Sequence, residues 1–222
     1  WTTVPVMLKK MLASKRFRGK HLRKIKVVWC GGDAVSEDLV QAVDSCVAAF
    51  GGSAKVMRGY GLTETCGVCV VNTYSFNKPF TCGQPLPGCS VIVVDENGNP
   101  LPVGEKGEIV ITSVGAMNGY LGGEPAKQGI ATGDVGFLDE DGYLTVVDRK
   151  KRMVKIAAVN VFPSEVEKAI CQLPSVDEAC VVPVGVNGKT FLKAFVTLAD
   201  CSKPFDPSVV IDHCAKRLIK YA

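Results

Sequence analysis

A predicted β-hairpin at residues 132–149 constrains this chain more than any other feature. Two short apolar runs, Val135–Leu138 and Tyr143–Val147, flank the sequence Asp-Glu-Asp-Gly. A polar turn that closes on glycine between two apolar runs is typical of an antiparallel hairpin. The register of this hairpin then decides which polar residues meet at its open end.

The open end of the hairpin brings residues of opposite charge together. If Leu138 pairs with Tyr143, Asp134 lies opposite Val147, and Arg149 follows two residues later. A carboxylate accepts hydrogen bonds and a guanidinium donates them, so the two groups together suit a vicinal diol. The same spacing also fits an ordinary surface ion pair, which contributes little to stability. The residues alone leave both interpretations open.

Two glycine-containing segments after predicted strands offer a second set of polar groups. Gly-Gly-Asp-Ala at Gly31–Ala34 follows a strand expected at Ile25–Cys30, and Gly-Tyr-Gly-Leu-Thr-Glu-Thr at Gly59–Thr65 follows one expected at Ala54–Arg58. Glycine there lets a ligand approach the backbone closely. In the second segment the tyrosine ring suits a purine face, and the threonine and glutamate suit a phosphate with Mg²⁺. A glycine-rich turn with a helix cap explains the segment equally well.

Together these segments resemble the adenylate-forming ligases, which include acyl-CoA synthetases, non-ribosomal peptide adenylation domains and beetle luciferases. The matching segments are Gly-Gly-Asp-Ala from Gly31, Gly-Tyr-Gly-Leu-Thr-Glu from Gly59, Thr-Gly-Asp from Thr132, Asp-Arg-Lys-Lys from Asp148 and Val-Asn-Val-Phe-Pro-Ser-Glu-Val-Glu from Val159. The resemblance covers about residues 1–222. Its last segment is most similar to synthetases that act on fatty acids or related acids.

The resemblance implies an α/β, or mixed α+β, fold in three parts. Residues 1–81 would form an α/β lobe of the large AMP-binding domain. Residues 82–150 would form a β-barrel-like subdomain that ends in the ribose-binding hairpin, and residues 151–222 a small, incomplete C-terminal α+β domain. The family's phosphate-binding loop would precede this stretch and its catalytic lysine would follow it, so we expect a partial chain.

Apolar residues at helical spacing predict four helices. The first is expected at residues 4–14 and the second at 36–50, with Ser36 as its N-cap. The third begins at Ser164, with a capping box to Glu167, and the fourth begins near Ser208.

The resemblance also implies which residues contact the nucleotide. Tyr60 would stack on the adenine, and Asp134 would hold the ribose hydroxyls with the help of Arg149. The complete predicted set is Gly32, Asp33, Ala34, Tyr60, Gly61, Asp134 and Arg149.

Four further positions take roles from the resemblance. Thr63 and Glu64 would be catalytic, because Thr63 would contact the α-phosphate and Glu64 would hold the magnesium ion. Lys151 lies two residues after Arg149 and would be the hinge between the large and small domains. Ala158 would line the channel for coenzyme A.

The implied reaction joins a carboxylic acid to coenzyme A through an acyl-adenylate, with ATP, AMP and Mg²⁺. Many acyl-CoA synthetases have glycine where this chain has Ala158, and its methyl group can crowd the thiol arm of coenzyme A. An enzyme that loads a carrier protein is therefore an alternative. A non-catalytic nucleotide-binding or interaction module is another.

Composition limits the partners of the chain. Its 222 residues are 47% apolar and 22% charged, which is ordinary globular composition. The net charge of +4 is too small to imply a nucleic-acid partner, and no apolar run is long enough to cross a membrane. A basic stretch at Lys15–Lys26 can meet an anionic ligand such as a phosphate, although a solvated rim is the commoner explanation.

The cysteines and the start of the chain suggest a location. Ten cysteines fall mostly within apolar segments, where a free cysteine behaves as a small hydrophobe. Cys66 and Cys69 form a lone C-x-x-C, which lacks the further ligands that a zinc site needs. The first residues do not form a secretory signal. We expect a reduced, cytoplasmic protein, with or without peripheral contact with a membrane.

Overall fold

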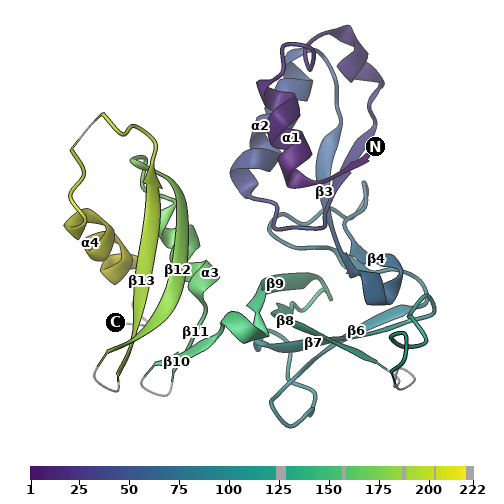
Figure 1. Ribbon diagram of the computed structural model, residues 1–222. Helices are drawn as coiled ribbons and strands as arrows, with labels where there is room; N and C mark the ends of the chain where they lie inside the picture. The colour runs from purple at the N-terminus through teal and green to yellow at the C-terminus, as the bar shows by residue number, and fades with distance from the viewer. Residues whose placement is uncertain (124–128, 157–158, 187–188, 203, 219–222) are drawn as a thin grey trace. The chain divides into compact units, whose positions relative to one another are not determined.

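The computed structural model describes the whole chain except residues 124–128, 157–158, 187–188, 203 and 219–222. The chain forms two compact units (Figure 1). The first contains Trp1–Thr132 and Gly136–Val146, and the second contains Gly133–Val135 and Val147–Ala222. The boundary between the units therefore passes through the predicted hairpin. The predicted three-part division, with boundaries after residues 81 and 150, stays a prediction.

The first unit starts with a five-stranded sheet of order β1-β2-β3-β4-β5. Strands β1 to β3 are parallel, and β4 and β5 are antiparallel to their neighbours. The helices α1 (Pro5–Ala13), η1 (Lys20–Lys24, a 3-10 helix) and α2 (Glu37–Ala49) connect the parallel strands. The strands are β1 (Thr2–Thr3), β2 (Val27–Cys30), β3 (Lys55–Leu62), β4 (Gly67–Val71) and β5 (Gln84–Pro85).

Helix α2 begins where the sequence predicts. The side chain of Ser36 accepts a hydrogen bond from the backbone N–H of Leu39, which satisfies one of the free donors of the first turn. Glu37 and Asp38 follow in that turn, where negative charge is favourable. The buried face of α2 packs with α1 and the sheet in a core that includes Leu8, Val28, Val40, Val43, Val47 and Val56.

Strand β3 is longer than the sequence predicts. A strand to Arg58 and a loop from Gly59 were expected, but β3 continues to Leu62. Up to Arg58 it pairs in parallel with β2, and from Gly59 it pairs antiparallel with β4. Its glycines serve close strand packing rather than a loop, because a Cβ atom at Gly61 would overlap the carbonyl oxygen of Gly67.

A four-stranded sheet of order β6-β7-β8-β9 follows, and the predicted hairpin is its β8–β9 pair. Leu144 is fully buried in its core. At the turn, Asp139 accepts hydrogen bonds from the backbone N–H groups of Asp141 and Tyr143. Lys78 lies within 2.8 Å of the carboxylates of both Asp139 and Asp141, so it ties the turn to the rest of the unit. The strands are β6 (Cys89–Val94), β7 (Gly107–Ser113), β8 (Ile130–Leu138) and β9 (Leu144–Arg149).

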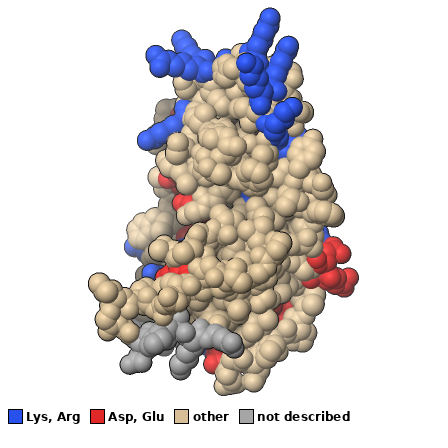
Figure 2. Space-filling view, turned by 90° about the vertical axis from the view of Figure 1, so that its right-hand side faces the viewer, with Lys and Arg blue, Asp and Glu red and all other residues tan. Residues whose placement is uncertain are grey.

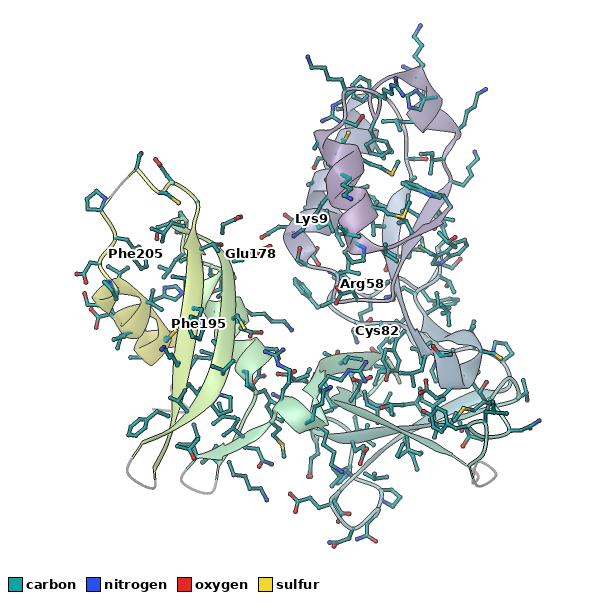
Figure 3. All side chains as sticks on the ribbon, viewed as in Figure 1. Lys9, Arg58, Cys82, Glu178, Phe195 and Phe205 are labelled. Carbon is teal, nitrogen blue, oxygen red and sulfur yellow. The ribbon has the colours of Figure 1, made fainter. Side chains whose placement is uncertain are left out.

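The second unit has helices on one face of a long hairpin. Two short strands, β10 (Val154–Ile156) and β11 (Val159–Val161), precede it. Helices α3 (Pro163–Ile170) and α4 (Ser208–Arg217) share one core with the inward residues of β12 (Val176–Val186) and β13 (Lys189–Leu198). Figure 3 labels Phe205, which packs at this core, and Phe195, which is 54% exposed on the hairpin.

Helix α3 does not begin with the predicted capping box. The helix starts at Pro163, and Phe162 is its N-cap. The hydroxyl of Ser164 donates to the carbonyl oxygen of Val147, 2.8 Å away, instead of capping the helix. Glu167, the other member of the predicted box, accepts hydrogen bonds from Arg152 and from the backbone N–H of Val181. Partners from other elements, Val147, Arg152 and Val181, therefore replace the local cap.

Candidate functional site

The two glycine-containing segments meet at one edge of the first sheet. Strands β2 and β3 are parallel neighbours, and their parallel pairing ends where Cys30, the last residue of β2, pairs with Arg58. The next residues approach closely, because a Cβ atom at Gly31 would lie 2.8 Å from the carbonyl oxygen of Gly59. In open α/β sheets, ligands bind at this edge. The predicted adenine residues Gly32, Asp33 and Ala34 are exposed there, and Tyr60 and Gly61 follow on β3.

Arg58, which Figure 3 labels, lies on β3 beside this edge and bonds to the segment that follows β2. Its guanidinium forms a 2.7 Å ion pair with Glu37 and donates to the carbonyl oxygen of Val35, 3.2 Å away. Both partners lie just after the Gly31–Ala34 segment, so Arg58 ties that segment to β3. No local sequence pattern indicates this role for Arg58.

Thr63 and Glu64 lie on a single turn of 3-10 helix, η2 (Thr63–Thr65), between β3 and β4. Thr63 is exposed, whereas the neighbouring Thr65 is 4% exposed. The hydroxyl of Thr65 accepts from the backbone N–H of Leu62 at 3.0 Å and donates to the carbonyl oxygen of Gly67 at 2.8 Å. Thr65 thus closes the turn that presents the two predicted catalytic residues.

We expect Thr65→Val to destabilise the first unit, because it leaves the N–H of Leu62 and the carbonyl of Gly67 without this partner. Leu62 is partly buried and Gly67 is exposed, so each lost hydrogen bond costs the ordinary net amount of about 0.5–1.5 kcal/mol. Thr63→Val is the matched control, since its side chain is exposed. Trp1 and Trp29 are the only tryptophans and both lie in the first unit, so tryptophan fluorescence during urea unfolding measures this change. Equal midpoints for both variants would contradict the role of Thr65.

Tyr120 reaches Glu64 from a segment far along the chain. Its hydroxyl donates to Oε1 of Glu64 at 2.6 Å, and the N–H of Met117 donates to the carbonyl oxygen of Glu64 at 2.8 Å. These two bonds fix the side chain and the backbone of Glu64 at once. No local sequence pattern predicts this contact of Tyr120.

The Tyr120 bond predicts a measurable pKa. The hydrogen bond to the Glu64 carboxylate raises the pKa of the Tyr120 phenol above its ordinary value, because it stabilises the protonated form. The bond is therefore present at neutral pH and is lost as pH rises through the raised pKa. Glu64→Gln should lower this pKa, which NMR of tyrosine labelled with ¹³C at Cζ measures. A Tyr120 pKa that is unchanged in Glu64→Gln would show that the bond does not form in solution.

Asp134 and Arg149 form the second predicted group, at the open end of the β8–β9 hairpin. The carboxylate of Asp134 is buried, and its Oδ1 lies 2.9 Å from Nε of Arg149. The side chain of Arg149 is 53% exposed, so a ligand can reach its guanidinium. The hairpin closes one residue away from the predicted register, because the N–H of Asp139, rather than Leu138, pairs with Tyr143, donating to its carbonyl oxygen at 3.1 Å. A buried carboxylate beside an accessible guanidinium is the arrangement that suits a vicinal diol.

The comparisons with known proteins identify the family. A family model described as AMP-binding enzyme matches residues 1–121, which is more than half of the chain. The chain belongs to the AMP-binding enzyme family. A second model, the AMP-binding enzyme C-terminal domain, matches residues 165–222. The predicted resemblance is therefore confirmed.

Curated relatives of this AMP-binding enzyme chain are CoA ligases that act on different acids. A feruloyl-CoA synthase from Amycolatopsis sp is 36% identical over 90% of the chain and 41% of the relative. A 2-succinylbenzoate–CoA ligase from Bacillus licheniformis is 34% identical over 75% and 36%. A long-chain-fatty-acid–CoA ligase from Escherichia coli is 29% identical over 99% and 39%. The chain spans about two-fifths of the length of these relatives.

Solved structures confirm the mixed α/β fold. ATP-bound MatB from Rhodopseudomonas palustris matches 99% of the chain and 44% of its own, with a TM-score of 0.86 and 26% identity. The o-succinylbenzoate CoA synthetase from Bacillus subtilis, in complex with ATP and magnesium ion, matches 99% of the chain and 45% of its own, with a TM-score of 0.82 and 27% identity.

The carboxylate of Glu64 fits a magnesium ion whose other ligands come from a nucleotide and water. Mg²⁺ usually takes one or two carboxylates and completes its shell with substrate phosphates and water. Within the residues that the structure describes, no three His, Cys, Asp or Glu side chains form a metal-binding group. Glu64 has a carboxylate with one oxygen held by Tyr120, which matches one such ligand, and its role as a magnesium ligand stays a prediction.

The predicted hinge lies in a segment that is fastened to the second unit. Lys151 is exposed on η3 (Lys150–Arg152). Asp148, which is buried, accepts from the N–H of Ser164 at 2.9 Å, and Arg152 pairs with Glu167. Both bonds tie the ends of this segment to α3. The hinge role of Lys151 stays a prediction, and Ala158, the predicted coenzyme A residue, lies outside the described residues.

The structure thus brings the predicted residues together in two groups. Residues 32–34, 60, 61, 63 and 64 belong to the first unit, and Asp134 and Arg149 belong to the second. The C-x-x-C pair does not form a disulfide, since Cys66 is exposed and Cys69 is buried on β4. No helix in the described part of the chain is long and apolar enough to span a bilayer.

Proposed function

We propose that this chain carries adenine-nucleotide contacts of an AMP-forming acid–thiol ligase. The observation that carries the proposal is the buried carboxylate of Asp134, held 2.9 Å from the half-exposed Arg149 at the end of the hairpin. The family match and the ATP-bound structural relatives support it. Because the chain spans only part of its relatives, the complete reaction is proposed for the protein as a whole.

The proposed reaction has two steps. A carboxylate oxygen attacks the α-phosphorus of ATP, and pyrophosphate leaves with the electron pair of the broken P–O bond. The thiolate of coenzyme A then attacks the acyl carbon of the adenylate, and AMP leaves. A magnesium ion, when bound, offsets the negative charge that develops on the phosphate oxygens.

The residues of this chain take distinct roles in that scheme. Asp134 accepts hydrogen bonds from the ribose hydroxyls, and Arg149 donates to them. The ring of Tyr60 stacks on the adenine, and the exposed hydroxyl of Thr63 contacts the α-phosphate. Glu64, oriented by Tyr120, holds the metal ion. Gly32, Asp33, Ala34 and Gly61 shape the nucleotide surface around these contacts.

The acid and the thiol acceptor are finer proposals. We propose a fatty acid or a related carboxylic acid, because the segment from Val159 resembles synthetases for such acids. The relative from Escherichia coli is named for long-chain fatty acids. We propose coenzyme A as the acceptor, in line with the names of all three curated relatives.

Calorimetric titration of the 222-residue chain tests this function. We expect saturable binding of AMP and of a non-hydrolysable acyl-adenylate, and weaker binding of CMP, because a pyrimidine gives Tyr60 a smaller face. AMP binding should change little with Mg²⁺, whereas ATP binding should strengthen. A chain that is folded by circular dichroism but binds AMP no better than CMP would contradict the proposed nucleotide contacts.

A further inference from the structure

A strongly basic surface lies at one end of the first unit, away from any role in the proposed reaction. No acidic residue precedes Asp33, although nine lysines and arginines lie between Lys9 and Lys26. Because the whole chain has 26 basic and 22 acidic residues, the remainder is net acidic. Figure 2 shows lysine and arginine side chains gathered at this end. The nine residues, hereafter the basic surface, are Lys9, Lys10, Lys15, Arg16, Arg18, Lys20, Arg23, Lys24 and Lys26.

Buried anchors hold the basic surface in a defined conformation. Phe17 is 5% exposed and Leu22 is fully buried, so the connection between α1 and β2 is packed onto the unit. Arg18 donates to the carbonyl oxygens of Leu12 and Phe17, and Arg23 donates to that of Phe50 at 2.9 Å. These two arginines satisfy backbone acceptors. The basic surface is therefore part of the fold and not a loose charged tail.

The seven remaining basic side chains are exposed and carry uncompensated charge. In the part of the chain that the structure describes, none of Lys9, Lys10, Lys15, Arg16, Lys20, Lys24 and Lys26 forms an ion pair. Neighbouring charges of the same sign repel one another, and this repulsion destabilises the folded state. A solvated rim would gain from acidic residues among these lysines, and there are none. This pattern favours a surface that meets an anionic partner.

The type of side chain indicates which partner fits. Six of the seven uncompensated residues are lysines, and lysine acts as a point charge without the bidentate geometry of arginine. Phe17, which lies among these residues in the sequence, is buried, and its ring packs against that of Trp1, which is 38% exposed. Tryptophan rings are enriched at membrane interfaces. Val6 and Met7 are about half exposed, one helical turn before Lys9 and Lys10. A lysine field beside exposed apolar side chains suits anionic lipid headgroups at a membrane surface.

We propose that the basic surface docks the protein onto an anionic membrane. Clusters of four to eight lysines and arginines bind acidic lipids by charge attraction, and each charge near the bilayer strengthens binding about fivefold. The interaction is electrostatic, so it weakens as salt shortens the range of the field. It does not require nucleotide binding, so it stands or falls separately from the proposed ligase function.

Co-sedimentation of the 222-residue chain with vesicles tests this docking. The two vesicle types are pure phosphatidylcholine and phosphatidylcholine mixed with phosphatidylserine. We expect binding only to the phosphatidylserine vesicles at about 0.1 M salt, and loss of that binding near 1 M salt. Equal binding to both vesicle types, or binding to neither, would overturn the proposal.

Two variants with the same net charge locate the surface. Lys15→Gln, Lys20→Gln and Lys24→Gln together should weaken vesicle binding about a hundredfold, because three charges are lost. The control variant, Lys168→Gln, Lys193→Gln and Lys216→Gln, changes three exposed lysines of the second unit and should bind as the parent does. Unaltered circular dichroism, which reports on both units, shows that both variants are folded. Equal losses in the two variants, or tighter binding to a DNA duplex than to vesicles at the same salt, would overturn the assignment.

Discussion

Gly61→Ala should strongly destabilise the first unit. A Cβ atom at this position would overlap the carbonyl oxygen of Gly67 and lie 2.7 Å from Cα of Val68, so β4 must move away from β3. Both neighbours are backbone atoms, which cannot rotate aside as a side chain can. Overpacking of this kind costs about 3 kcal/mol, near the upper end of its typical range. The turn that contains Thr63 and Glu64 connects β3 to the displaced strand β4, so the proposed contacts with the metal ion and the phosphate should weaken as well.

Gly185→Ala is the matched control for this substitution. Gly185 also lies within a strand, β12, but a Cβ atom there would meet nothing within 4 Å. Urea unfolding followed by circular dichroism, which reports on both units, should show a large loss for Gly61→Ala and no loss for Gly185→Ala. A normal midpoint for Gly61→Ala would mean that β3 and β4 do not pair as described.

Asp134→Ala should weaken AMP binding about tenfold to a hundredfold. Hydrogen bonds to a charged group contribute about 1.5–3 kcal/mol, and this substitution removes the carboxylate that accepts from the ribose hydroxyls. Stability should change less than affinity, because the abandoned Arg149 is 53% exposed and water can solvate its guanidinium. Calorimetry measures the affinity, and circular dichroism measures the melting temperature.

Glu140→Gln is the control for the loss of charge. Glu140 is exposed at the turn of the same hairpin, opposite the end that holds Asp134. Its replacement removes one negative charge from the hairpin but no proposed contact. If Asp134→Ala binds AMP as tightly as the parent does and Glu140→Gln binds it more weakly, the proposed position of the ribose at the Asp134 end of the hairpin is wrong.

Local sequence signals predicted those elements whose partners lie nearby. Ser36 caps α2 as expected, because its acceptor meets an N–H only three residues away. The β8–β9 hairpin also forms where predicted, because a short turn joins its strands, but Asp139 rather than Leu138 pairs with Tyr143. Ser164 carried an equally good local signal, but its hydroxyl binds Val147, 17 residues earlier in the sequence. A capping pattern cannot report a competing acceptor that folding brings close.

The roles of Tyr120 and Thr65 could not be predicted, for related reasons. Tyr120 meets Glu64 across 56 residues, and no local pattern links them. Thr65 stands beside the predicted catalytic pair, but the sequence does not show that it is buried while Thr63 is exposed. The sequence did not predict that β3 continues through Gly59 and Gly61, because glycine is unfavourable within strands. Only the pairing with β4 makes glycine necessary there.

The most direct test of the account pairs a change in the protein with a change in the ligand. AMP and 2′,3′-dideoxy-AMP would be titrated calorimetrically into the parent chain and into Asp134→Asn, which keeps the shape of the side chain. If Asp134 holds the ribose hydroxyls, the parent should bind dideoxy-AMP at least tenfold more weakly than AMP. Asp134→Asn should then bind the two ligands with nearly equal affinity. If Asp134→Asn still prefers AMP as strongly as the parent does, Asp134 does not hold the ribose and the central claim is wrong.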